Sequence, residues 1–211
     1  MSHDDWPLPS LAFHIADAEN WSAIERMGLH STTALIARNG LSAEEARPFA
    51  GYRNQSMRLP SGAVIRDQRP MPPSALTRCL DAGLAPQAWY DLVNAKVFFW
   101  LQVERLDRHL AACRARPQIV VAVDLRRMLA RHGQSAFVTP FNVGNARRRP
   151  ASRGRRTFVR LDAWLKTRWE SEAPQGRPAR ARTHPPAEIA IQGSVPDLMD
   201  FVVETRPVAP R

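Results

Sequence analysis

The segment Gln118-Ile119-Val120-Val121-Ala122-Val123-Asp124 constrains the fold more than any other part of the chain. A short run of β-branched and apolar residues bounded by polar segments is typical of a buried strand. The run Lys96-Val97-Phe98-Phe99-Trp100-Leu101 has the same character, and Leu11–Ile15 alternates with a period of two. Because helical segments separate these strands, the sequence predicts an α+β fold.

Start and stop signals place the remaining elements. Gly28 ends a helix whose apolar residues begin at Trp21, and the cap of this helix is expected at Asp17. Ser42 has capping-box spacing with Glu45. Further helices are expected at 32–38, 74–82, 86–94, 103–115, after Asp124, at 161–169 and at 198–203. Further strands are expected at 63–65, 136–138, 157–159 and 188–192.

The chain is long enough for one domain with a proper core. It has 211 residues, of which 44% are apolar and 24% are charged, an ordinary globular composition. Cys79 and Cys113 are its two cysteines, too few for a disulfide framework. No stretch approaches the roughly 20 apolar residues of a membrane span, and no signal peptide is recognised. A single domain over 1–211 and a cytoplasmic location are therefore expected.

Positive charge is concentrated in one region. Residues 147–182 contain 12 basic and 3 acidic residues, which accounts for +9 of the formal net charge of +10. Such a patch attracts polyanions, although a charge run is more often a solvated surface. Residues 171–187 are expected to form a basic loop rich in Pro and Arg. The candidate nucleic-acid-binding residues are Arg147, Arg148, Arg149, Arg153, Arg155 and Arg156.

Several common chemistries have no motif in this sequence. It contains no Gly-rich phosphate loop, no GxSxG and no HExxH. His109 and Cys113 are four residues apart, but two ligands do not make a zinc site, so no metal is expected. From local pattern alone, His14 is more simply a histidine hydrogen-bonded at a sheet edge, and Glu188 a solvated carboxylate.

Two segments near the ends of the chain favour functional roles for His14 and Glu188. Phe13-His14-Ile15 through Gly28-Leu29-His30-Ser31 is followed, late in the chain, by Ala187-Glu188-Ile189-Ala190-Ile191-Gln192-Gly193-Ser194-Val195-Pro196. The first resembles the opening of DarT-type nucleic-acid ADP-ribosyltransferases and of RNA 2′-phosphotransferases. The second is similar to the DarT segment in which a catalytic Glu precedes an apolar strand and a Val-Pro turn. Between these ends the resemblance is architectural.

The resemblance implies an ADP-ribosyltransferase-like split β-sheet core with flanking helices, and a reaction that uses NAD as co-substrate. It implies His on the first strand, an aromatic residue on a middle strand and Glu on a late strand. Glu188 would be the catalytic carboxylate. Residues implied to bind NAD are His14, Ser31, Arg66, Phe99 and Trp100. DarT enzymes carry an Arg soon after the middle strand; here none occurs before Arg105, so Arg66 or Arg69 would supply the cation for the pyrophosphate.

The function expected from these features is NAD-dependent ADP-ribosylation of DNA or RNA, in a toxin or phage-defence effector that an antitoxin could accompany. Three alternatives stay open. One is an RNA 2′-phosphotransferase-like enzyme, and another is a protein ADP-ribosyltransferase. The third is a nucleic-acid-binding module without enzymatic activity on a degenerate transferase fold.

Overall fold

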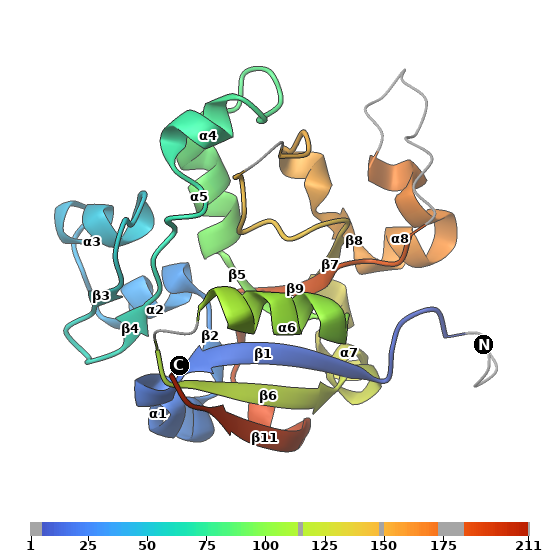
Figure 1. The fold of residues 1–211 in the computed structure, drawn as a ribbon, viewed down its shortest axis with the longest axis horizontal. Helices are drawn as coiled ribbons and strands as arrows, with labels where there is room; N and C mark the ends of the chain where they lie inside the picture. The colour runs from blue at the N-terminus through green and yellow to red at the C-terminus, as the bar shows by residue number, and fades with distance from the viewer. Residues whose placement is uncertain (1–5, 114–115, 148–149, 173–183, 211) are drawn as a thin grey trace.

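The computed structural model describes residues 6–113, 116–147, 150–172 and 184–210. Its centre is a seven-stranded sheet in the order β11-β6-β1-β5-β9-β7-β8 (Figure 1). All the strand pairs of this sheet are antiparallel. The strands are β1 (Leu11–Asp17), β5 (Lys96–Trp100), β6 (Gln118–Asp124), β7 (Ala136–Thr139), β8 (Val159–Arg160), β9 (Glu188–Gln192) and β11 (Val202–Val208). The predicted α+β class is confirmed.

Two short ribbons and eight described α-helices complete the fold. The ribbons pair β2 (Leu29–His30) with β10 (Ser194–Val195), and β3 (Met57–Arg58) with β4 (Val64–Ile65). The helices are α1 (Trp21–Met27), α2 (Thr32–Arg38), α3 (Ala43–Ala50), α4 (Pro73–Thr77), α5 (Pro86–Asn94), α6 (Val103–Ala112), α7 (Leu125–His132) and α8 (Leu161–Thr167). Short 3-10 turns are η2 (Ala18–Asn20), η3 (Gly133–Ser135), η4 (Arg155–Thr157), η5 (Arg168–Glu172) and η6 (Leu198–Asp200). Within the described residues, no helix has the length and apolar character needed to cross a membrane.

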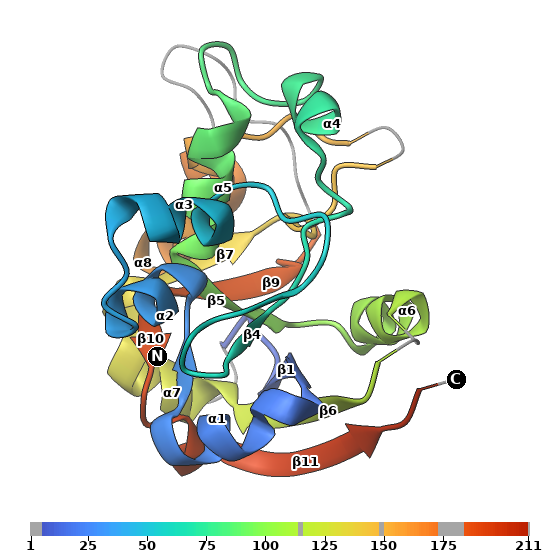
Figure 2. The same ribbon diagram turned by 90° about the vertical axis from the view of Figure 1, so that its left-hand side faces the viewer.

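The two faces of the sheet are covered by different helices. α7 packs Leu125, Met128 and Leu129 on the face that carries Val121. α6 packs Leu106 and Leu110 on the opposite face, against Ile15 and Val120. Figure 2 shows α6 and α7 on opposite sides of the β1–β6 pair. The spacing of apolar residues on each helix is that of one buried stripe.

A third cluster lies under α4 and α5. Trp89 and Tyr90 of α5 are almost completely buried there, together with Leu76 of α4. Phe158 packs on the same cluster, and its ring lies 5.6 Å from that of Trp89. The segment before β8 is thereby fixed against the middle of the chain.

The predicted helix at 198–203 and the predicted helix cap at Asp17 are wrong. Residues 198–203 do not form a helix, because only η6 is helical and the chain then extends into β11. Val202, Val203 and Thr205 are β-branched, which favours an extended chain, and β11 completes the edge of the sheet beside β6. Asp17 makes no cap hydrogen bond and ends β1 instead.

Candidate active site

The three strands that carry the expected site residues are neighbours in the sheet. β1, β5 and β9 lie side by side in that order. Phe13 of β1 is paired with Trp100 of β5, and Trp100 is paired with Glu188 of β9. Since residues opposite one another on neighbouring strands project from the same face, these three form a row. A row across three strands spans about 10 Å, so the fold brings the two ends of the chain together.

Glu188 is a buried carboxyl, and one of its two oxygens is held by hydrogen bonds. Its side chain is 4% exposed. Oε2 accepts hydrogen bonds from Thr139 Oγ1 at 3.0 Å and from the backbone N–H of Val143 at 3.1 Å. Among the described residues, Oε1 has no hydrogen-bond partner. The carboxyl is therefore held by one oxygen and presents the other to any ligand that reaches it.

Burial raises the pKa of Glu188 to about 7, because desolvation penalises the ionised form. The hydrogen bonds from Val143 and Thr139 oppose this rise, as do the positive charges of Arg105 and Arg153. Near neutral pH the group therefore exists in both forms. A carboxyl balanced in this way is typical of functional sites.

His14 is a neutral imidazole with a defined tautomer. Burial is the main cause that lowers its pKa to about 4; the hydrogen bond with Phe98 opposes the decrease, and the positive charge of Arg66 contributes to it. Its Nδ1 lies 2.9 Å from the backbone carbonyl oxygen of Phe98. A carbonyl oxygen only accepts, so Nδ1 carries the proton and donates it. Nε2 is then left as an acceptor.

His14 and Glu188 are on neighbouring parts of the sheet but not in contact. His14 is paired with Val121, whose side chain lies in the main core. Successive residues of a strand point to opposite faces, so His14 leaves β1 on the face opposite the row of Phe13 and Glu188. Its ring reaches the carbonyl of Phe98 where β1 and β5 separate. The two side chains therefore project from opposite faces of the sheet and do not meet.

The two aromatic candidates occupy different environments. Phe99 is fully buried in the main core, so it does not offer the free ring face expected from the sequence. Its place follows from strand alternation, which points Phe99 away from the row of Trp100. Trp100 is half-buried, and its ring lies 5.4 Å from that of His109 on α6. Of the two, Trp100 is the candidate for stacking on a ligand.

Arg66 lies near the end of β1. Its Nε is 3.4 Å from Oδ2 of Asp17, and its Nη2 donates to Oε1 of Gln118 at 2.6 Å. Its positive charge lowers the pKa of both His14 and His109. The Arg66 side chain is 29% exposed, so it is paired within the protein without being sealed from solvent.

The two end segments that carry the motifs are in contact. β2 pairs with β10, and the backbone N–H of Ser31 donates to the carbonyl of Gly193 at 2.9 Å. His30 Nδ1 lies 2.8 Å from Ser194 Oγ. The hydroxyl of Ser31 accepts from the N–H of Ala34 and caps α2. Ser31 is thus placed as a buried helix cap at the junction of the two segments.

The candidate nucleic-acid-binding arginines divide into two groups. Arg147, Arg155 and Arg156 are exposed, and Arg148 and Arg149 lie outside the described residues. Arg153 is 2% exposed and therefore does not belong to the surface expected from the sequence. Its guanidinium donates to the carbonyl of Val143 and lies over the rings of Trp89 and Phe141, which holds it inside. The basic loop expected at 171–187 lies largely outside the described residues, at 173–183.

His109 and Cys113 form a pair without further ligands. Cys113 Sγ lies 3.6 Å from His109 Nε2, as their helical spacing predicts. Burial lowers the pKa of His109 to about 4, so this imidazole is neutral. In the part of the chain that the structure describes, no group of three or more His, Cys, Asp or Glu residues is arranged to hold a metal ion.

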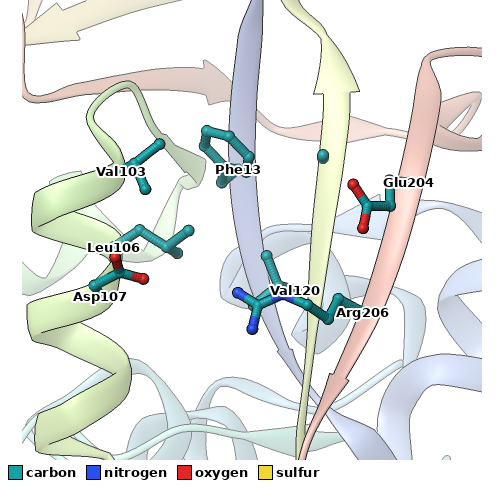
Figure 3. Close-up of a pocket in the computed structure, with 8 residues that line it drawn as sticks. Phe13, Val103, Leu106, Asp107, Val120, Glu204 and Arg206 are labelled. Carbon is teal, nitrogen blue, oxygen red and sulfur yellow. The ribbon is translucent and has the colours of Figure 1, made fainter.

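Two cavities lie away from Glu188. The first has a volume of about 100 Å³ and lies between α6 and the strands β1, β6 and β11. Figure 3 shows Leu106 and Asp107 of α6 facing it, with Phe13 on β1 and Arg206 on β11. The second, of about 370 Å³, lies between α7 and α8 beside Trp6. Neither is lined by His14 or Glu188.

The sequence did not predict that Thr139, Arg153, Arg105 and the backbone N–H of Val143 would act on Glu188. Thr139 and Arg153 come from parts of the chain with no recognisable spacing to Glu188. Arg105 carries a signal that could have found it, since it is the first arginine after the aromatic strand. Gln102 Oε1 accepts from Arg105 Nε at 2.7 Å, which fixes the guanidinium at the start of α6.

The comparisons with known proteins give one match. A family model described as a family of unknown function, DUF7002, matches residues 10–202. No curated protein and no solved structure matches the chain. The matched range contains every described candidate residue, and it ends at the first residue of β11.

Proposed function

Since this chain belongs to the DUF7002 family, whose function is unknown, we propose its activity from the site: NAD-dependent ADP-ribosyl transfer to nucleic acid. One observation carries the proposal. Glu188 is a buried carboxyl with one oxygen held by Thr139 and Val143, and it opens a strand two places from the strand of His14. The intervening strand carries Trp100 in register with it. The neighbouring positions of these three strands support the proposal.

The proposed reaction breaks the bond between ribose and nicotinamide, and positive charge develops on the sugar as it breaks. An ionised Glu188 stabilises that charge through Oε1, while Oε2 stays on its two donors. Nicotinamide is cationic in NAD, so it leaves without a general acid. A carboxylate beside a sugar that becomes positively charged also acts in glycoside hydrolysis.

The remaining residues have roles suited to their chemistry. His14 is not proposed to bind the ribose that Glu188 faces, because its side chain leaves β1 on the opposite face of the sheet. Trp100 offers a half-buried ring for stacking. The guanidinium of Arg66 matches two oxygens of a pyrophosphate, although Asp17 competes for it. Ser31 supports the junction of the motif segments and is not proposed to touch NAD.

The acceptor is proposed to be nucleic acid because exposed cations lie near the segment that holds Glu188. Val143 donates to Glu188, and Arg147 is exposed four residues later in the chain. Arg155 and Arg156 are exposed further along the same segment. Guanidinium groups bind phosphates of either DNA or RNA, so this surface supports a nucleic-acid acceptor over a protein one.

The experiment is incubation of the purified protein with NAD labelled in the adenylate, together with single-stranded DNA, RNA or a protein mixture. Label transfer to DNA or RNA, with release of nicotinamide, is the expected result. Glu188→Gln should abolish transfer, and Glu44→Gln, the same change at an exposed carboxylate, should leave it intact. Full activity in Glu188→Gln would remove the proposed mechanism.

The alternatives give different results in the same preparation. Transfer only to protein would identify a protein ADP-ribosyltransferase, and an ADP-ribose cyclic phosphate formed from 2′-phosphorylated RNA would identify a 2′-phosphotransferase. A binding module without activity would bind polyanions in a salt-sensitive way, but NAD would not raise its melting temperature.

A further inference from the structure

Thr139 has one proton and two acceptors. Its Oγ1 lies 3.0 Å from the carbonyl oxygen of Phe141 and 3.0 Å from Oε2 of Glu188. A hydroxyl donates a single hydrogen bond. When Glu188 is ionised, both neighbours are acceptors, so only one of the two contacts is a hydrogen bond. When Glu188 is protonated, both are satisfied at once.

We propose that Thr139 is a positioning residue that couples the ionisation of Glu188 to the backbone at Phe141. With Glu188 neutral, the carboxyl O–H donates to Thr139 Oγ1, and Thr139 donates to the Phe141 carbonyl. Loss of the carboxyl proton to solvent reverses the chain: Thr139 rotates its O–H onto Oε2, and the Phe141 carbonyl loses the bond from Thr139. One proton leaves, and one hydroxyl changes its acceptor.

The backbone of Val143 holds the carboxyl in both states. Its N–H donates to Oε2 whether or not Glu188 is ionised, because a protonated carboxyl oxygen still accepts. The two contacts of the 139–143 segment therefore behave differently. The N–H of Val143 donates to Glu188 in both states. Thr139 donates to the Phe141 carbonyl only when Glu188 is protonated.

The charges around this group come from two elements. Arg105 on α6 and Arg153, in the segment before η4, both favour the ionised form of Glu188. Within the described residues, β5 and β7 face it with the uncharged Trp100 and Thr139. Arg153 also lies 4.9 Å from the ring of Phe141 and donates to the carbonyl of Val143. Arg153 thus contacts the segment whose Phe141 carbonyl gains or loses the bond from Thr139.

The consequence for catalysis rests on the proposed function, in which the ionised carboxylate is the active form. Thr139 then turns its proton toward Glu188 only in that form. The exchange itself exists whether or not the protein transfers ADP-ribose, so it is tested without an activity assay.

The test is an NMR titration of protein with ¹³C-labelled Glu carboxyls and Phe carbonyls, in which Glu188→Gln identifies the Glu188 signal. The Phe141 carbonyl shift should change with the same midpoint as the Glu188 carboxyl. Thr139→Ser should keep this step and Thr139→Val should lose it. The internal control is the backbone amide of Val143, observed with ¹⁵N labelling. Its shift should follow the titration of Glu188 in the unmodified protein, in Thr139→Ser and in Thr139→Val.

Two results would overturn the proposal. One is a Phe141 carbonyl that does not respond while Glu188 titrates in the unmodified protein, a result that needs no variant to fold. The other is a step retained in Thr139→Val. A coupled titration in a protein that releases no nicotinamide would sustain the proton exchange and count against the transferase. Transferase activity without a coupled titration would sustain the transferase and count against the proton exchange.

Discussion

Gly28 lies directly against the backbone of Pro196. Its φ is +74°, and a Cβ at this position would lie 2.5 Å from Pro196 Cα and would also overlap the carbonyl of Val195. Only glycine combines that backbone conformation with so close an approach. The contact joins the segment that follows His14 to the turn that follows Glu188, and it explains why both segments belong to one structural unit.

Gly28→Ala should therefore destabilise the protein strongly. Backbone strain at φ +74° and ψ −169° alone costs about 1–3 kcal/mol, and the overlap with Pro196 adds to it. Gly40→Ala is the matched control, because Gly40 has a φ of +64° but no atom within 4 Å of the added Cβ. Urea unfolding should show a loss for Gly28→Ala at least twice that for Gly40→Ala. Equal losses would mean that the contact with Pro196 relaxes freely.

Glu188→Gln should change how stability depends on pH. The folded protein holds the Glu188 proton to a pKa of about 7, against 4.5 as the ordinary value. Between these values the folded state binds more protons than the unfolded state, so this group makes stability fall as pH rises from 4.5 to 7. The glutamine variant lacks that loss. From pH 4.5 to pH 7, its free energy of unfolding should therefore rise by about 3 kcal/mol relative to that of the unmodified protein.

The measurement is the free energy of unfolding in urea at pH 4.5, 6 and 7.5. Glu44→Gln is the control, since Glu44 is exposed and its substitution should leave the pH dependence as it is. A constant difference between Glu188→Gln and the unmodified protein over these pH values would contradict the raised pKa of Glu188.

His14 should stay neutral through the physiological range with its proton on Nδ1. Its folded pKa is about 4, below the ordinary 6.5, so its contribution to stability is present above pH 6.5 and is lost as pH falls toward 4. ¹⁵N NMR of the imidazole should show protonated Nδ1 and bare Nε2 at pH 7, with the signal identified by its absence in His14→Gln. A midpoint near 6.5 would contradict the lowered pKa, and a protonated Nε2 with a bare Nδ1 at pH 7 would contradict the hydrogen bond to Phe98.

Exposed and buried arginines should behave differently on substitution. Arg147→Gln and Arg155→Gln should weaken binding to single-stranded DNA or RNA and reduce its salt dependence, by about one unit of slope per lost phosphate contact. Arg127→Gln, at an exposed position on α7, is the control and should have little effect. Fluorescence anisotropy at several salt concentrations measures both quantities.

Arg153→Gln should instead lower stability, because the buried guanidinium holds the carbonyl of Val143 and contacts two aromatic rings. Its melting temperature should fall, and its nucleic-acid affinity should change little once the sample is folded. A loss of nucleic-acid affinity without a loss of stability would contradict this structural role and indicate that Arg153 binds nucleic acid.

Most of the secondary structure followed from local signals. β6 has the bounds predicted from its apolar run, and the capping box at Ser42 forms as its spacing indicates. The error at 198–203 arose because a strand at a sheet edge depends on its neighbour. The residues of β11 gain their pairing from β6, and a partner distant in the sequence leaves no local pattern.

Motif likeness in the sequence selected Glu188 as a candidate and predicted none of its contacts. The structure places Thr139 and the backbone N–H of Val143 as hydrogen-bond donors to it. Thr139 could not be predicted, since its contact with Glu188 depends on the register between β7 and β9. Phe99 and Arg153 were misplaced for a related reason: their direction is set by strand alternation and by packing on Trp89, which composition does not reveal.

β1 and β5 share a single pair of residues, Phe13 and Trp100, whereas β1 and β6 pair along their whole length. The two strands also meet through the hydrogen bond from His14 to the carbonyl of Phe98 and through the rings of His14 and Phe99, whose centroids are 5.7 Å apart. Few backbone hydrogen bonds therefore join the two halves of the sheet at this seam, and the apolar core that Ala12 shares with Val97 holds them together.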